Sequence, residues 1–226
     1  MGWDWIILDG QHGCFNYETL YECIHVIRAG GSKPFVRVSI GYLAEIQRIL
    51  DLGAAGIVVP MVNSKEEAAA AAAAAKYPPK GERSIGGDFR THFGNKYPIT
   101  ANDDTKLFIQ MEHIRSAEAI DDIMSLDGVD GCYVGPTDLA LSLGLGHVGF
   151  ESNPTHQRAI QDTLEACLRH GKIASINAYS VADVTDRIRA GFQWVTMRSD
   201  MDLFMDAGKS LLSTLDEVRT TAAVAK

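Results

Sequence analysis

The sequence lacks the features that mark membrane-spanning, secreted or nucleic-acid-binding proteins. No stretch of about 18 apolar residues occurs, so no membrane span is expected. The N-terminus has no basic segment followed by an apolar one, so no secretory signal is expected. The 21 Lys and Arg residues are outnumbered by 29 Asp and Glu, and the net charge of −8 includes no basic cluster. Nucleic-acid binding therefore has little electrostatic support.

Cysteine is scarce as well. The four cysteines (Cys14, Cys23, Cys132 and Cys167) are scattered and form no Cys-x-x-Cys pair. This pattern is typical of reduced thiols in a cytoplasmic protein, and it disfavours a disulfide framework or a structural zinc site. Hydrophobic residues make up 46% of the chain. We therefore expect one domain over residues 1–226 with a sizeable core.

Short apolar runs alternate with amphipathic stretches along the whole chain. The runs predict strands at 5–9, 34–38, 56–61, 107–112, 131–134, 172–176 and 194–197. The stretches between them predict helices at 17–29, 43–52, 65–76, 116–126, 154–170, 181–190 and 201–224. Short strands rich in Val, Ile and aromatics are typical of a parallel sheet buried on both faces. The longest irregular piece, 77–104, is rich in Gly, Pro and Asn, and a loop of that length is usually functional.

Repeated strand–helix units predict an α/β fold with right-handed crossovers. An open doubly wound sheet and a closed (β/α)₈ TIM barrel both fit this pattern. The count of strands is seven, whereas a barrel needs eight. Because the chain opens on Met1-Gly2-Trp3 directly before a strand, we expect either an open sheet or a barrel that lacks its first strand.

Polar residues gather where the predicted strands end. They are Asp9 and His12, Arg37, Gln110 and Glu112, Asp138, and Arg198 with Asp200. In an α/β barrel the carboxyl ends of the strands form the active-site face. We therefore expect these side chains to converge.

Two carboxylates stand out among them. Gln110 and Glu112 are two residues apart on one strand and point the same way, and Asp138 follows the next strand. Carboxylates without a nearby His or Cys suit a hard cation such as Mg²⁺ or Mn²⁺. Alternatively, Glu112 caps the next helix or pairs with Arg115, and Asp138 belongs to the first turn of a helix.

His12 and Arg37 also have two interpretations each. His12 lies among glycines and suits a general base near neutral pH, or it is an ordinary loop histidine. Arg37 lies inside an apolar strand, where a guanidinium needs a partner. That partner is either the carboxylate of an anionic substrate or a structural one, for which Asp9 and Glu112 are the candidates.

Two further charged residues are unexplained by local structure. Asp51 ends a predicted helix, where the helix dipole disfavours an acid, so it has some other purpose, such as orienting a histidine. Arg83, in the long irregular piece, contacts substrate, a neighbouring subunit or solvent.

Short motifs over residues 3–215 resemble the HpcH/HpaI aldolase (citrate lyase) family of the phosphoenolpyruvate/pyruvate superfamily. The motifs are Asp4-Trp5-Ile6-Ile7-Leu8-Asp9-Gly10-Gln11-His12, Val36-Arg37, Leu50-Asp51-Leu52-Gly53-Ala54, Val59-Pro60-Met61-Val62, Lys76-Tyr77-Pro78-Pro79-Lys80-Gly81-Glu82-Arg83, Gln110-Met111-Glu112, Gly128-Val129-Asp130-Gly131 and Gly135-Pro136-Thr137-Asp138-Leu139. Each motif is short, but their order and spacing together are specific.

The resemblance implies a (β/α)₈ barrel that cleaves 4-hydroxy-2-oxo acids reversibly to pyruvate and an aldehyde. It implies that Glu112 and Asp138 hold a divalent cation (Mg²⁺, Mn²⁺ or Co²⁺). The other implied roles are Gln110 supporting metal and pyruvate, Arg37 binding pyruvate, His12 as base with Asp51 as its dyad partner, and the backbone of Gly135 and Thr137 holding the pyruvate carboxylate. A hexamer built from dimers is also implied, with the last helix, 201–224, packing across a subunit boundary.

The sequence departs from the family pattern near its end. Arg198-Ser199-Asp200 stands where a Gly-Val-Asp turn is expected, so Arg198 either recognises a second acidic group on the aldehyde or narrows the pocket. Thr137 stands where Ala is common. Alternatives to aldol cleavage are oxaloacetate decarboxylation or carbon–carbon bond synthesis through the same enolate, and an inactive family member without a first strand. A CoA-ester lyase is disfavoured because no basic groove is evident.

Overall fold

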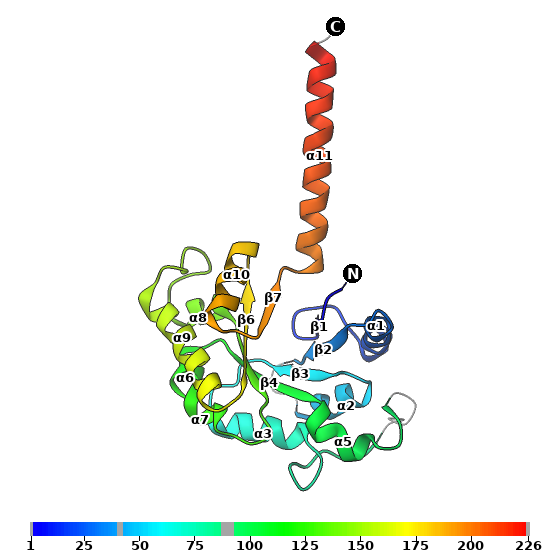
Figure 1. The fold of residues 1–226 in the computed structure, drawn as a ribbon, viewed down its shortest axis with the longest axis vertical. Helices are drawn as coiled ribbons and strands as arrows, with labels where there is room; N and C mark the ends of the chain where they lie inside the picture. The colour runs from blue at the N-terminus through cyan, green and yellow to red at the C-terminus, as the bar shows by residue number, and fades with distance from the viewer. Residues whose placement is uncertain (1, 40–42, 87–92, 225–226) are drawn as a thin grey trace.

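The computed structural model describes residues 2–39, 43–86 and 93–224, and its centre is a seven-stranded parallel sheet (Figure 1). The strands are β1 (Trp5–Asp9), β2 (Lys33–Arg37), β3 (Gly56–Val59), β4 (Lys106–Met111), β5 (Gly131–Val134), β6 (Ile173–Ala178) and β7 (Trp194–Met197). Each strand pairs with the next one in the chain, in the order β1 to β7. A doubly wound sheet would reverse its strand order at a switch point. The expectation of a barrel-type sheet with one strand fewer than eight is therefore confirmed, and the doubly wound alternative is wrong.

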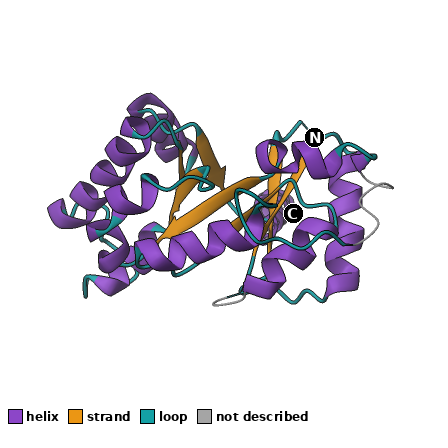
Figure 2. Ribbon diagram, turned by 90° about the horizontal axis from the view of Figure 1, so that it is seen from below, coloured by secondary structure: helices purple, strands orange, loops and turns teal. Residues whose placement is uncertain are grey.

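The helices lie around the outside of the curved sheet, apart from the last one, which projects away from the body (Figure 1 and Figure 2). They are α1 (Tyr17–Ala29), α2 (Leu43–Asp51), α3 (Lys65–Ala75), α5 (Tyr97–Asp104), α6 (Ile114–Glu118), α7 (Ile120–Met124), α8 (Pro136–Ser142), α9 (Pro154–Arg169), α10 (Val181–Ala190) and α11 (Asp200–Val224). Several begin at a side-chain cap, in which an oxygen accepts a free backbone N–H of the first turn. The caps are Asn16, Ser64, Asn153 and Ser180.

The expected helices differ from the observed ones in three places. The stretch 77–104 was expected to be irregular, but its last part forms α5, and its residues 87–92 lie outside the described chain. The helix expected at 116–126 is two short helices that meet at Ala119. Helix α8 was not expected beyond a possible first turn. Both α5 and α8 carry Pro at the start, where its fixed φ suits a helix although the residue reads as a breaker elsewhere.

Alternation along the strands separates two cores. Outward residues such as Leu8, Val36 and Ile109 pack against the helices in the main hydrophobic core. Inward residues form a smaller cluster inside the curve of the sheet, where Phe35 and Phe108 are fully buried. The period of two that sets strand side chains on opposite faces explains this division.

Glycine makes room for the inner aromatic rings. A Cβ at Gly56 would lie 2.2 Å from Cε1 of Phe35, and one at Gly131 would lie 2.7 Å from Cε1 of Phe108. The rings then meet one another, with Phe35 and Trp194 edge to face at 4.6 Å between centroids. These two strand glycines are therefore required by packing, not by backbone conformation.

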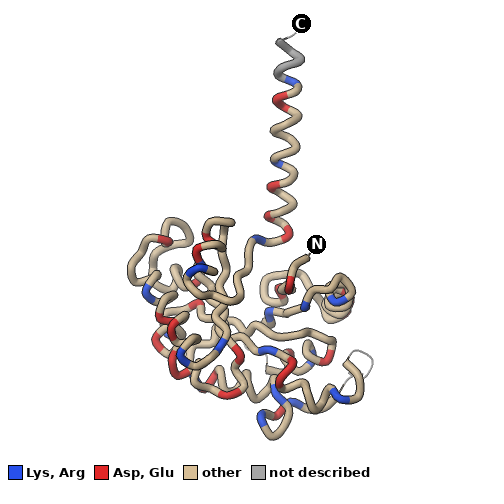
Figure 3. The backbone as a smooth tube through the Cα atoms, viewed as in Figure 1, with Lys and Arg blue, Asp and Glu red and all other residues tan. Residues whose placement is uncertain are grey.

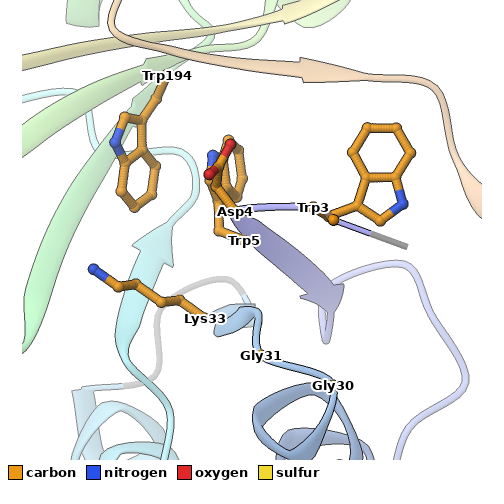
Figure 4. A pocket seen from close by; sticks show the side chains of 8 residues that line it. Trp3, Asp4, Trp5, Gly30, Gly31, Lys33 and Trp194 are labelled. Atoms are coloured by element: carbon orange, nitrogen blue, oxygen red, sulfur yellow. The ribbon is translucent and has the colours of Figure 1, made fainter.

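The two edges of the sheet, β1 and β7, are bridged by side chains at their amino-terminal ends. Trp5 and Trp194 stack with centroids 4.6 Å apart. Beside them lies a cavity of about 470 Å³, also lined by Trp3, Asp4 and Lys33 (Figure 4). All these residues begin strands or precede them. The cavity is thus at the opposite end of the strands from the polar residues that follow their carboxyl ends.

Charged residues of both signs are interspersed over the body and along α11 (Figure 3). Helix α11 stands clear of the rest of the chain (Figure 1), and none of its side chains from Asp200 to Arg219 is buried. Among the residues that the structure describes, no helix is both long and apolar enough to cross a bilayer.

The inner aromatic cluster should contribute strongly to stability. Phe35→Ala would leave a cavity among Trp5, Phe108 and Trp194, and we expect a loss of about 3–5 kcal/mol in the free energy of unfolding. Urea unfolding followed by tryptophan fluorescence measures it. Ile99→Ala, at a side chain that is 80% exposed on α5, should change stability by less than about 0.5 kcal/mol. Equal losses in the two variants would contradict this account of the inner core.

Candidate active site

Some of the polar residues expected at the strand ends lie on the inner side of the sheet. Asp9 and Arg37 are register partners at the ends of β1 and β2, on the same face as the inner aromatics. Gln110 pairs in register with Tyr133, also inward. Moving toward the carboxyl ends, the inner face thus changes from aromatic rings to charged and amide groups.

Glu112, one residue beyond β4, is the most enclosed carboxylate of this group, with 3% of its surface exposed. Its Oε1 accepts the backbone N–H of Met61 at 2.8 Å, and its Oε2 accepts Nε2 of Gln110 at 2.5 Å. Met61 has a left-handed backbone, with φ of 56°, and its N–H is directed at the carboxylate. Neither the next helix nor Arg115 is its partner, since His113 caps α6. That alternative for Glu112 is therefore wrong.

Asp138 lies in the first turn of α8, as its alternative interpretation predicted, and it is exposed. Its charge nevertheless affects the pKa of Glu112. Burial raises the pKa of Glu112, and the negative charge of Asp138 raises it further, against the lowering effect of the Met61 N–H and of Arg37. Two acids that interact in this way, one of them desolvated, favour uptake of a positive charge between them.

The surroundings of Glu112 fit a hard cation. Oε1 of Gln110 is buried and has no hydrogen-bond partner, so an acceptor oxygen beside the carboxylate is left for another group. A Cβ at Gly135 would lie 3.1 Å from Nε2 of Gln110 and 3.2 Å from Oε2 of Glu112, so a larger residue there would crowd both side chains. Within the described ranges, no three His, Cys, Asp or Glu residues gather as a metal-binding group. The groups available near Glu112 are two carboxylates, its own and that of Asp138, and the Gln110 amide, and oxygen donors of this kind suit a cation that keeps several waters.

Arg37 forms a two-point ion pair with Asp9. Its Nε and Nη2 lie 2.9 and 2.6 Å from the two carboxylate oxygens. Burial lowers the pKa of Arg37, but the hydrogen bonds and charge of Asp9 outweigh this and raise it. For Asp9 burial raises the pKa, and Arg37 with two backbone N–H groups brings it below its ordinary value. The structural partner proposed for Arg37 is thus present, and Nη1 takes no part in the pair.

His12 and Asp51 are not brought together in this chain. His12 is exposed in the turn after β1, where its backbone N–H donates to Asp9. Asp51 ends α2, five residues before β3 begins, so it lies toward the amino-terminal ends of the strands.

Arg83 holds Asp51 at that other end. Its Nη2 lies 2.7 Å from Oδ1 of Asp51, its Nη1 donates to the Tyr97 hydroxyl, and its guanidinium lies 4.5 Å from the ring centroid of Tyr77. The Arg83 side chain is fully buried, so the solvated alternative is wrong. Its positive charge also explains how an acid is tolerated at the carboxyl end of a helix.

The remaining predicted residues are placed as follows. The Gly135 N–H already donates to the carbonyl of Met111 at 2.9 Å. The Thr137 hydroxyl lies 2.6 Å from that of Tyr179. Arg198 is exposed with a left-handed φ of 63° and forms an ion pair with Asp206 of α11.

Sequence reasoning missed Met61, Tyr133 and Tyr179. Tyr133 points inward, where its hydroxyl lies 2.9 Å from that of Thr196, and burial raises its pKa to about 12. Its spacing of two from Gly135 is the signal that would have placed it on the inner face. The Met61 contact is made by a backbone N–H and leaves no such signal.

Comparison with known proteins gives a consistent result. The chain is 35% identical over 216 residues to a 5-keto-4-deoxy-D-glucarate aldolase of Shigella sonnei, covering 94% of this chain and 84% of that protein. Its fold is similar to an HpcH/HpaI aldolase of Desulfitobacterium hafniense, with a TM-score of 0.88, 28% identity, and 96% and 85% of the two chains covered. It is also similar to the citrate synthase SbnG, with a TM-score of 0.85, 26% identity, and 96% and 86% covered.

The sequence pattern of one family matches residues 1–207, a range that contains all seven strands and every polar residue described above. Relatives by sequence and by fold include aldolases of the same family. The chain therefore belongs to the HpcH/HpaI aldolase/citrate lyase family.

Proposed function

We propose that this protein is a divalent-metal-dependent class II aldolase that cleaves a 4-hydroxy-2-oxo acid reversibly to pyruvate and an aldehyde. The observation that carries the proposal is the buried Glu112 carboxylate, oriented by Met61 and Gln110 and coupled to Asp138. The unpartnered amide oxygen of Gln110 supports it.

Glu112 and Asp138 would hold the cation, and Gln110 would support it from within. When bound, a divalent cation acts as a Lewis acid that stabilises the negative charge developing on the 2-oxo oxygen of the substrate. Mg²⁺, Mn²⁺ and Co²⁺ all suit oxygen donors of this kind.

Arg37 would bind the oxo-acid end of the substrate. It is held by Asp9 through Nε and Nη2, so the guanidinium is fixed before substrate arrives and little ordering cost remains. The Thr137 backbone would hold the carboxylate, whereas Gly135 would contribute space, because its N–H is already bonded to Met111.

His12 would act as the base. In cleavage it takes the proton of the 4-hydroxyl group as the C3–C4 bond breaks, the aldehyde leaves, and the bonding electrons pass to the pyruvate enolate beside Arg37. A proton returned to C3 completes pyruvate. His12 is exposed in the turn after β1, where it can exchange protons with solvent.

The dyad role implied for Asp51 needs revision within one chain. Asp51 is bonded to Arg83 and lies toward the end of the strands opposite to His12. We propose that its role in the chain is to neutralise the buried Arg83, with His12 acting without it.

The substrate proposed first is a sugar-derived oxo acid of the 5-keto-4-deoxy-glucarate type, because relatives of that name cover nearly the whole chain. Arg198 would face a second acidic group on the aldehyde half, in exchange for its contact with Asp206. The second candidate is carbon–carbon bond synthesis or oxaloacetate decarboxylation through the same enolate, which the similarity to a citrate synthase favours. Comparing pyruvate release from hydroxy-oxo acids and from oxaloacetate separates the two.

A homo-oligomer, a hexamer as a trimer of dimers, is also proposed. Helix α11 exposes Phe204, Leu211, Leu215 and Val218 by half or more of their surface. An isolated helix gains little stability in water, and contiguous exposed apolar side chains are typical of interfaces. A second copy packed on α11 would bury these apolar side chains and stabilise the helix.

The four cysteines are free thiols, which suits the proposed cytoplasmic location.

Metal binding should depend on Glu112. We expect Glu112→Gln to weaken Mn²⁺ binding, measured by calorimetry, by at least ~10-fold. Changes at residues that only hydrogen-bond the metal ligands already cause losses of this order. EDTA should abolish pyruvate release by the wild type, and Mn²⁺ should restore it. Because the pKa of Glu112 is raised, it takes up a proton at higher pH than an ordinary Glu, so Mn²⁺ affinity should fall as the pH is lowered from neutral. The exposed Glu118→Gln on α6 is the control. Unchanged Mn²⁺ binding by Glu112→Gln would refute the site.

Asp51→Asn should separate stability from catalysis. The substitution leaves the buried Arg83 cation without its carboxylate, so it should lower the free energy of unfolding by about 3 kcal/mol. The pH profile of kcat should stay unchanged. The exposed Asp104→Asn should alter neither. A shifted pH profile without a loss of stability would instead restore Asp51 to the dyad.

Association should depend on the apolar face of α11. The double variant Leu211→Asp with Leu215→Asp should sediment as a monomer, because charges on that face oppose its burial. Ser213→Asp, on the opposite face of the same helix, should sediment like the wild type. Identical sedimentation of the double variant and the wild type would exclude α11 from the interface.

A further inference from the structure

A pair of hydroxyl groups beside Asp138 has no role in the reaction as described so far. Tyr179 is the residue directly after β6, two positions beyond Asn177, and so continues the inward row of that strand. Its hydroxyl lies 2.6 Å from that of Thr137, which immediately precedes Asp138. The contact joins two neighbouring strand ends across the mouth of the site.

Tyr179 is fixed from its backbone. Its N–H donates to Oδ2 of Asp183 at 3.0 Å, and the other oxygen of Asp183 accepts Nε of Arg187. Asp183 in turn donates its N–H to the Ser180 cap of α10. The phenol ring therefore projects from an ordered turn, and 40% of the residue remains exposed.

The hydroxyl pair has one donor to spare. Two hydroxyl groups carry two O–H bonds, and the contact between them uses one. The other O–H is available, at an exposed position, to an acceptor oxygen on a bound molecule. A hydrogen bond to a substrate hydroxyl or carboxyl oxygen would use it.

The position of the pair defines which part of the substrate it meets. Arg37 and Asp9 lie at the ends of β1 and β2, whereas Thr137 and Tyr179 follow β5 and β6. Glu112, after β4, lies between them in the order of the sheet, and Asp138 follows Thr137 after β5. A substrate whose oxo-acid end lies between Arg37 and the Thr137 backbone would bring its other half within reach of Tyr179, which follows the next strand, β6.

We propose that Tyr179, held by Thr137, binds an oxygen substituent on the aldehyde half of the substrate and so selects hydroxylated aldehydes. This rests on the proposed aldolase function. It adds a specificity-determining residue that neither the motifs nor the metal site requires.

Two aldehydes of equal size test the proposal in the addition direction. Glycolaldehyde and propanal have the same number of heavy atoms and differ by a hydroxyl in place of a methyl group. Each is condensed with pyruvate in the presence of Mn²⁺ by the wild type, Tyr179→Phe, Thr137→Val and the control Tyr21→Phe, an exposed tyrosine on α1. The kcat/KM of each aldehyde and the KM of pyruvate are measured, with thermal unfolding as a check on folding.

Tyr179→Phe should lower kcat/KM for glycolaldehyde about five- to tenfold relative to propanal, the value of one hydrogen bond. The KM of pyruvate should not change, and Tyr21→Phe should resemble the wild type. Thr137→Val should shift the ratio in the same direction and supplies the test if Tyr179→Phe does not fold.

An unchanged ratio of the two aldehydes in both variants would overturn the inference and leave the aldolase function intact. A wild type that condenses neither aldehyde with pyruvate would overturn the proposed function and this inference with it. The two failures are therefore distinguishable.

Discussion

Glu112 carries a carboxylate in a place that water scarcely reaches, and much of the site follows from how that charge is accommodated. Two hydrogen bonds, from a backbone N–H in a left-handed turn and from a glutamine amide, fix its orientation. They do not neutralise it, because a second acid lies close by and burial keeps its pKa raised. A buried acid next to another acid is unfavourable unless a cation is shared between them. The Arg37 charge offsets this only in part, since the pKa of Glu112 stays raised, and the proposed cation would supply the remaining positive charge.

The packing inside the curved sheet leaves room for these polar groups. Its inner face is filled by aromatic rings toward the amino-terminal ends, with glycines opposite them. That packing fills the inner face toward the amino-terminal ends of the strands and leaves the carboxyl ends for polar groups. A single alternation of side chains therefore sets the helix-facing core, the aromatic layer and the polar layer at once. Changing the register of one strand by a residue would move its contribution from the site to the helices.

The sequence was sufficient to predict the parts of this structure that are local or periodic. All seven strands appear as short apolar runs, and Gln110 and Glu112 share a face because they are two residues apart. The contacts that could not be predicted join residues far apart in the chain. Asp51 and Arg83 are 32 residues apart, and Met61 and Glu112 are 51 apart. The local sequence around these residues does not specify their partners, because the contacts form only when α2, α3 and the strands pack together.

The family includes proteins named for cleavage and for synthesis, and the layout of the strand ends offers a way to separate the two. The proposed enolate needs only the groups around Glu112, Asp138 and Arg37, and these lie on β1 to β5. In the proposed mechanism the partner of the enolate would be selected at the ends of β6 and β7, which Tyr179 and Arg198 follow in this chain. Arg198 is tied to Asp206 of α11, the helix that projects from the body. If a second copy covers α11, assembly would change the surroundings of Asp206 and therefore of Arg198. The specificity of one site would then depend on contact with the second subunit.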